Sequence, residues 1–138
     1  DLEAIRKAAE KFKVAPVSIM NFVEGTRFTQ EKHGKQNSPY AHLLKPKAGG
    51  LTAILNFMGE RVPWILDVSI VYPKGAPSLW EFLCGEVEEI RVRVREIPVE
   101  PELRGDFGED KAFRRAFMGW LKGCWQEKDR TMEEMIRS

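Results

Sequence analysis

The 138-residue sequence predicts an α/β fold of three layers, in which helices flank a central mixed sheet. Two kinds of apolar pattern succeed one another along the chain. Some segments place apolar residues three and four positions apart, as helices do, whereas others alternate or form short continuous apolar runs, as strands do. The predicted order of elements is helix, strand, helix, strand, helix, strand, helix. This regular alternation is typical of an α/β domain.

The first half of the chain contains two predicted helices and one predicted strand. Leu2–Lys13 has one apolar helical face, and Val17–Val23 is a β-branched and aromatic run that predicts a buried strand. Phe28–Tyr40 is polar and rich in turn-forming residues, so we expect a loop there. Lys47–Met58 resumes helical spacing, and Gly59 provides a stop signal.

The second half of the chain contains two predicted strands and two predicted helices. Trp64–Tyr72 is apolar enough for a second buried strand, and Ser78 with Glu81 has the spacing of a capping box that opens a short helix. Glu88–Ile97 alternates strictly between apolar and charged residues, which predicts a strand near a sheet edge with one dry face and one wet face. A long helix is expected beyond Asp110.

Composition limits the classes of function. The hydrophobic content of 43%, the charged content of 31% and the formal net charge of +1 are those of an ordinary globular domain without a global bias towards anions. No apolar run approaches the ~18 residues that span a bilayer, and no signal peptide is visible. Cys84 and Cys124 are expected to be reduced thiols, although one distant disulfide remains an alternative.

A polar segment follows the first predicted strand, where α/β sheets bind their ligands. Gly25 permits a sharp turn and a close approach to the backbone. Arg27 offers a planar fork of donors that suits a phosphate, Thr26 adds a hydroxyl, and Glu24 can accept a hydrogen bond from a ligand hydroxyl or hold the arginine. The alternative is a turn at the end of a strand with a surface pair between Glu24 and Arg27.

Three segments in order resemble blocks of the glycerolipid acyltransferases, the 1-acylglycerol-3-phosphate acyltransferase family. They are FVEGTRF at Phe22–Phe28, LLKPKAGGL at Leu43–Leu51 and ILDVSIVYP at Ile65–Pro73. The resemblance implies an acyltransferase-like fold and a role in phospholipid biosynthesis. An acyl group would move from acyl-CoA or acyl-carrier protein, as co-substrate, to a lysophospholipid such as 1-acylglycerol 3-phosphate. It implies a membrane surface as partner, no nucleic acid and no other cofactor.

The resemblance also implies which residues bind the acceptor. Carried over to this sequence, the residues that would bind the glycerol phosphate are Glu24, Gly25, Thr26 and Arg27, with Lys47 as a second phosphate ligand. Lys47 would lie near a helix N-terminus, where the backbone dipole also favours anions. Its alternative is a basic residue at the start of a solvated helix. The expected location is the cytoplasmic face of a bacterial inner membrane.

The proton-transfer residues of that family are missing from this sequence. The family separates a histidine from an aspartate by four residues, and neither His33 nor His42 has an aspartate at that offset. Two alternatives remain: a C-terminal fragment of a longer enzyme or a divergent, inactive relative. The start of the chain at Asp1, directly within a helical pattern, favours the fragment.

The expected domain is therefore one piece of a longer enzyme. We expect residues 1–138 to be the C-terminal part of one acyltransferase domain, incomplete at its N-terminus and inactive alone. The catalytic histidine and its aspartate are expected upstream of Asp1, so we assign no catalytic residue within the sequence.

Three other features allow two interpretations each. A basic strand face could bind lipid head groups or nucleic acid, as in a non-catalytic binding module, or be a solvated sheet edge; it comprises Arg91, Arg93 and Arg95. An aromatic stripe could dip into a membrane interface or pack in the core; it comprises Phe113, Phe117, Trp120 and Trp125. The charged residues Lys128, Asp129, Arg130, Glu133 and Glu134 indicate a solvated helix end. We favour the solvated edge and core packing.

Overall fold

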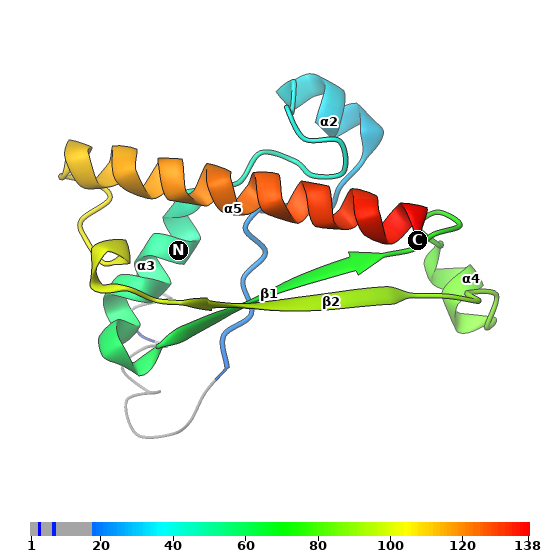
Figure 1. Cartoon of the computed structure of the whole chain (residues 1–138), viewed down its shortest axis with the longest axis horizontal. Helices are drawn as coiled ribbons and strands as arrows, with labels where there is room; N and C mark the ends of the chain where they lie inside the picture. Colours follow the sequence, from blue (N-terminus) through cyan, green and yellow to red (C-terminus); the bar gives the residue numbers. More distant parts are fainter. Residues whose placement is uncertain (1–2, 4–6, 8–17) are drawn as a thin grey trace.

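The computed structural model describes residues 3, 7 and 18–138. Figure 1 shows a long helix lying along a pair of strands, with smaller helices at both ends of the molecule and above it. The helices are α2 (Gln30–Gln36), α3 (Ala48–Met58), α4 (Leu79–Leu83) and α5 (Lys111–Arg137), with 3₁₀ turns η1 (Gly59–Arg61) and η2 (Pro101–Leu103). The strands are β1 (Trp64–Val71) and β2 (Arg91–Pro98).

The two strands pair antiparallel along their whole length. Trp64 lies opposite Pro98 at one end and Val71 lies opposite Arg91 at the other. Helix α5 contacts β1, and its N-terminal half also contacts α3. The core forms where α3, α5 and the segment before α3 meet, and its fully buried side chains are Leu44, Leu55, Phe117 and Leu121. Helix α3, which follows the predicted site, is therefore anchored in the core.

Several boundaries follow from end signals in the sequence. Gly59 has a positive φ of 55° and ends α3. Ser78 and Glu81 form both hydrogen bonds of the capping box that opens α4. Asp110 caps α5 by accepting a hydrogen bond from the backbone N–H of Phe113 at 2.9 Å. The stop at Gly59 and the capping box at Ser78 and Glu81 are confirmed predictions, because both depend on interactions between residues close together in the chain.

Two predictions for the first 40 residues are wrong. Residues 18–23 of the predicted strand Val17–Val23 are irregular, and the carbonyl of Val23 accepts a hydrogen bond from Lys47 N–H at 2.8 Å rather than from a neighbouring strand. The predicted loop Phe28–Tyr40 contains α2. Its signals are local: the Thr29 side chain caps the Lys32 N–H, and Asn37 takes a left-handed conformation at the other end.

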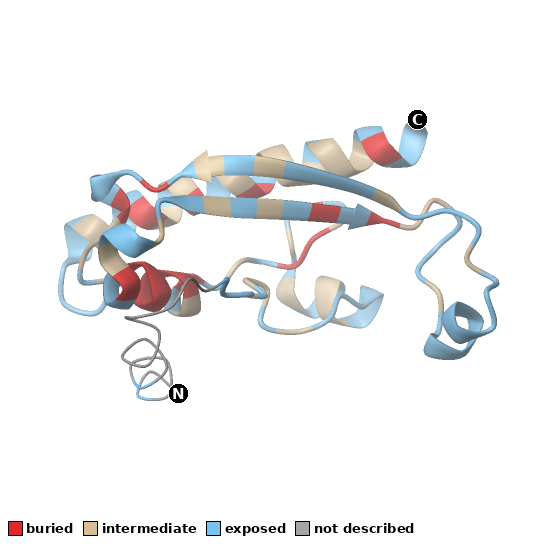
Figure 2. Cartoon of the chain, turned by 90° about the horizontal axis from the view of Figure 1, so that it is seen from below, coloured by how far each residue is buried: buried red, intermediate tan, exposed pale blue. Residues whose placement is uncertain are grey.

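Helix α5 covers the face of the two-stranded sheet that the sequence predicts to be solvated, and it leaves the apolar face uncovered. The arginine face of β2 lies against α5, while the apolar face of both strands is exposed (Figure 2). The exposed apolar side chains include Leu66, Val68, Ile70, Val92 and Val94. Carboxylates and carbonyl groups of α5 and β1 pair with the arginines, so α5 packs on that face. Strict alternation predicts that the faces differ but does not show which one is covered.

The described residues combine helices with a sheet, which is compatible with the α/β class. They show one two-stranded antiparallel sheet with the helix α5 on one of its faces, where the sequence predicts a mixed sheet between two helical layers. Within the part of the chain that the structure describes, no helix has the length and apolar content needed to cross a membrane.

The N-terminal expectations fall outside what the structure describes. Asp1 and the helix expected over Leu2–Lys13 lie outside the described residues, apart from Glu3 and Lys7. The catalytic histidine and aspartate expected upstream of Asp1 would lie beyond the sequence itself. Their existence therefore stays a prediction.

Candidate functional site

The predicted phosphate-binding residues form a tight turn. The backbone N–H of Gly25 donates a 2.8 Å hydrogen bond to the carbonyl of Phe22, which closes the turn. Gly25 has a φ of +71°, a left-handed conformation that costs other L-residues about 1–2 kcal/mol. The sharp turn predicted at Gly25 is thus confirmed. The turn precedes an extended stretch that leads to α2.

Lys47 lies directly against this turn, although 22 positions separate it from Gly25. A Cβ atom placed on Gly25 would be 3.2 Å from Lys47 Cδ and 3.3 Å from Lys47 Nζ. The backbone hydrogen bond between Lys47 and Val23 fixes the two segments together. Lys47 is also the N-cap of α3, whose next residues are small and whose first turn has no side-chain cap. The missing side chain at Gly25 therefore makes room for an ammonium group beside a helix N-terminus.

Arg27 is exposed and its guanidinium has no hydrogen-bond or ion-pair partner among the described residues. Only its backbone carbonyl is engaged, by Lys32. No ion pair joins Arg27 to Glu24, so the turn is not the surface Glu–Arg pair of the alternative interpretation. Within the part of the chain that the structure describes, the guanidinium donors of Arg27 are therefore available to an external acceptor.

Glu24 turns towards the interior instead. Its carboxylate is half-buried and accepts a hydrogen bond from the backbone of Leu44. Burial raises the pKa of Glu24 above its ordinary value, while the Leu44 hydrogen bond and the charge of Lys128 oppose that rise. Of the four residues in the predicted block, Glu24 is the one that ties the turn to the segment leading to α3.

Lys32 is a further cation beside the turn, which the sequence pattern did not predict. Its Nζ donates to the Thr26 hydroxyl at 2.7 Å and to the Arg27 carbonyl at 3.2 Å. Recognising α2 would have revealed it, because Thr29 caps the helix through the Lys32 N–H and so fixes that residue next to the turn. Two ammonium groups, from Lys32 and Lys47, therefore border the turn, and the exposed Arg27 directly follows Thr26 in the chain. Such a cluster favours an anionic ligand.

Helix α5 holds the segment that carries Lys47. The indole N–H of Trp125 donates to the Leu44 carbonyl at 3.0 Å in the buried core. The Asp129 carboxylate accepts hydrogen bonds from the backbone N–H groups of Ala41 and His42, both at 2.8 Å. These two side chains place the segment before α3 against the helix, and with it the position of Lys47.

The sequence predicts that the charged end of α5 is solvated. In the structure, part of it is buried and paired. Lys128 Nζ lies 2.6 Å from Asp67 Oδ1, and its side chain is only 12% exposed. Asp67 also binds Arg95 at 2.9 Å, so one carboxylate on β1 joins the helix to β2. Helical periodicity puts Lys128 on the polar side of α5, next to other charged residues. The acceptor for its ammonium group lies 61 positions earlier in the chain, and a local sequence pattern does not reveal such a distant partner.

Both histidines contact another group of the chain through Nε2. His33 lies in α2 and contacts the Tyr40 carbonyl through Nε2 at 2.6 Å. His42 contacts Glu133 Oε2 at 2.6 Å. Among the described residues, no group of three or more potential metal-binding side chains comes together. Cys84 and Cys124 are both free thiols, so the disulfide alternative is wrong.

The structure also bears on the basic strand face and on the aromatic stripe. All three arginines of the basic strand face are engaged within the chain: Arg91 with Glu89, Arg93 with Glu134 and Arg95 with Asp67. Core packing is confirmed for the aromatic stripe. Phe117 and Trp125 are buried in the core, and Phe113 and Trp120 pack against it.

Comparison with known proteins identifies the family. The chain is 31% identical over 124 residues to mouse 1-acyl-sn-glycerol-3-phosphate acyltransferase delta, in a match that covers 83% of this chain and 31% of that protein. It is 31% identical over 125 residues to the mouse gamma protein, with 84% and 31% covered. The human delta protein is 30% identical over 124 residues, with 83% and 31% covered.

The chain belongs to the 1-acyl-sn-glycerol-3-phosphate acyltransferase family. It spans about a third of the length of these acyltransferases, since each match covers 31% of the relative. The relatives are mammalian and give no support to the expected bacterial source. No family model matches the sequence, and no solved structure matches it.

Proposed function

We propose that this chain supplies the acceptor-phosphate site of an acyltransferase that esterifies a lysophospholipid, most specifically 1-acylglycerol 3-phosphate. The acyl group would come from acyl-CoA or acyl-carrier protein. The observation that carries the proposal is the contact between Lys47 and Gly25, two positions before Arg27, whose guanidinium has no partner among the described residues. Membership of the acyltransferase family supports the reaction class.

Each part of the site would contribute differently to binding. Arg27 would bind two phosphate oxygens with its planar fork, and Lys47 would add a point charge at the start of α3, where backbone N–H groups also face an anion. Thr26 and Lys32 already pair with each other, so Lys32 would keep the hydroxyl oriented and add to the positive potential. Glu24 would act by fixing the turn to Leu44.

Proton transfer would depend on residues upstream of Asp1. A histidine there, oriented by an aspartate, would remove the proton from the acceptor hydroxyl, whose oxygen would then attack the thioester carbonyl. The described histidines are committed to Tyr40 and Glu133, and no aspartate stands at the family offset from either. Residues 1–138 would thus form the C-terminal part of one acyltransferase domain and would lack turnover alone.

The fold proposed for the complete domain has three layers. The exposed apolar face of β1 and β2 supports it, because large apolar side chains on a strictly alternating sheet face are normally covered. A second helical layer from elsewhere in the enzyme would cover this face. The enzyme would work at a membrane, where its lipid acceptor resides.

Kinetics of an Arg27→Ala variant of the full-length enzyme test the proposed site. We expect KM for 1-acylglycerol 3-phosphate to rise at least about tenfold, because a bidentate charge-assisted pair is lost. The melting temperature should stay unchanged, since the guanidinium has no partner among the described residues. Lys45→Ala is the matched control, as that lysine is exposed two positions before Lys47. Wild-type kinetics in Arg27→Ala would contradict the assignment.

A further inference from the structure

Helix α4 exposes an unusual amount of apolar surface. Four of its five residues are large and apolar, and their exposed fractions are 75% for Leu79, 73% for Trp80, 51% for Phe82 and 67% for Leu83. None of them packs against the core of the described residues. Figure 2 shows α4 entirely exposed, at the end of the molecule away from α3. A cluster of this kind marks an interaction site more often than a chance feature of the surface.

The conformation of α4 is fixed although its side chains are exposed. The Ser78 hydroxyl accepts from Glu81 N–H at 3.2 Å, and Glu81 Oε2 accepts from Ser78 N–H at 2.6 Å. At the other end, Gly85 takes a positive φ of 74°, and Glu86 N–H donates to the Glu81 carbonyl at 3.0 Å. Both ends of a very short helix are therefore satisfied locally. The apolar side chains are presented by a preformed element and not by a loosely structured loop.

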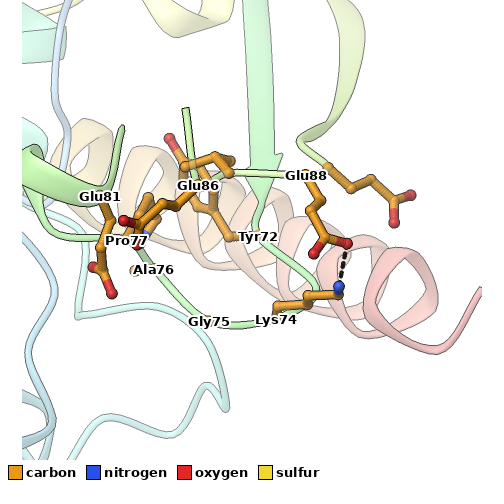
Figure 3. A pocket seen from close by; sticks show the side chains of 10 residues that line it. Tyr72, Lys74, Gly75, Ala76, Pro77, Glu81, Glu86 and Glu88 are labelled. Atoms are coloured by element: carbon orange, nitrogen blue, oxygen red, sulfur yellow. Dashed lines mark hydrogen bonds and ion pairs between the residues drawn. The ribbon is translucent and has the colours of Figure 1, made fainter. Parts of the chain in front are cut away.

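The charges around α4 are mainly negative. A hollow of about 190 Å³ between α4 and the strand ends is lined by four glutamates, Glu81, Glu86, Glu88 and Glu89, and by one lysine. Figure 3 shows Lys74 reaching Glu88, and Arg91 pairs with Glu89. The Ser78 hydrogen bonds lower the pKa of Glu81, so its carboxylate stays ionised near neutral pH. This rim repels anions.

We propose that α4 inserts its leucine, tryptophan and phenylalanine side chains into the interface of a zwitterionic lipid bilayer. Tryptophan prefers the level of the lipid head groups, and the neighbouring leucine and phenylalanine side chains supply apolar area for the acyl boundary. The acidic rim selects an uncharged surface over an anionic one, since anionic lipids attract basic segments and repel acidic ones. The inference rests on the proposed lipid acceptor, because such an enzyme has to meet its substrate at a bilayer.

Depth-dependent quenching tests the inserted state directly. The full-length enzyme carries Cys84→Ser and Cys124→Ser with an environment-sensitive fluorophore on Phe82→Cys, and it is reconstituted in phosphatidylcholine nanodiscs containing spin-labelled lipid. The control places the same fluorophore on Lys122→Cys, an exposed position of α5. We expect the probe at position 82 to be quenched at least about twofold more than the probe at 122, as an interfacial helix would be. Adding anionic phosphatidylglycerol should not increase the quenching.

Three results would overturn the proposal. An unquenched probe with a water-like emission at position 82 would show that α4 stays in solvent. An unquenched probe with an apolar emission would show that α4 packs on another part of the enzyme or on a second copy. Quenching that increases with phosphatidylglycerol would show that the surface selects anionic lipid. None of these readings requires acyl transfer, so they stand even if the proposed acceptor is wrong.

A kinetic experiment separates α4 from the acceptor site. The double variant Trp80→Ser, Leu83→Ser should raise the apparent KM about tenfold for an acceptor presented in phosphatidylcholine vesicles. The same variant should show wild-type KM for a short-chain acceptor dissolved as a monomer. Arg27→Ala should instead raise KM for both the vesicle-bound and the monomeric acceptor. Equal effects of the double variant on both forms would contradict a role in lipid contact.

Discussion

The contact between Gly25 and Lys47 restricts which substitutions either position tolerates. Gly25 combines a φ of +71° with an ammonium-bearing chain 3.2 Å from where a Cβ atom would be. The sequence suggested both the turn and the helix-terminal lysine, because each has a local signal. Their contact, and the interior direction of Glu24, depend on how separate segments pack, so they were not predictable from spacing.

The variant Gly25→Ala should damage the site twice. We expect the free energy of unfolding to fall by about 1–2 kcal/mol from left-handed strain, and KM for the acceptor to rise because Lys47 has to move. Urea denaturation and steady-state kinetics would measure the two effects. Gly34→Ala is the control, since that glycine lies within α2 with no atom near its absent Cβ. It should stabilise the protein slightly. Unchanged acceptor KM in Gly25→Ala would argue against the role of the contact.

At the scale of elements, α5 positions the site without supplying a ligand to it. Trp125 and Asp129 fix the chain before α3, and Lys128 fixes β1. The sequence predicted α5 and its buried aromatic stripe well, because a long 3.6-residue period is a strong signal. It failed for the polar residues of the same helix. Lys128, Asp129 and Glu133 have partners that lie 60 to 91 positions away in the chain, and periodicity carries no information about such distant pairs.

The variant Asp129→Ala tests whether Asp129 stabilises the segment before α3 or is only a solvated residue at the end of a helix. Two backbone N–H groups would lose a charged acceptor, so we expect the free energy of unfolding to fall by about 2 kcal/mol. Arg130→Ala is the matched control at the next position. Arg130 is exposed and pairs with Glu127 one turn away, so its removal should cost less than about 0.5 kcal/mol. Equal stability of the two variants would show that the Asp129 hydrogen bonds contribute nothing.

At the scale of the whole molecule, the sheet has one apolar face exposed in the described residues. The sequence predicted the β1 and β2 segments and their alternation, but not that α5 would cover the charged face. The reason is physical: arginines can pack against a helix when carboxylates and carbonyl groups meet their guanidinium groups, as Asp67 and Glu134 do here. Hydrophobicity alone would have placed α5 on the other side.

If the complete enzyme has three layers, the apolar face of β1 and β2 is buried in it. Val94→Asp, in the middle of that face, should then lower the free energy of unfolding of the full-length enzyme by at least about 2 kcal/mol, because it buries a charge. Lys122→Asp on the exposed surface of α5 should have little effect. Thermal or chemical denaturation would compare them. A harmless Val94→Asp would mean that no second layer covers the sheet.

The central claim is that Lys47 and Arg27 bind the phosphate of the lipid acceptor. Its most direct test measures kcat/KM of the full-length wild type, Lys47→Ala and Arg27→Ala on 1-acylglycerol 3-phosphate and on the corresponding acylglycerol without phosphate. The account predicts that both variants lose at least about tenfold on the phosphorylated acceptor and nothing on the phosphate-free one. Equal losses on both acceptors, or no loss on either, would contradict it.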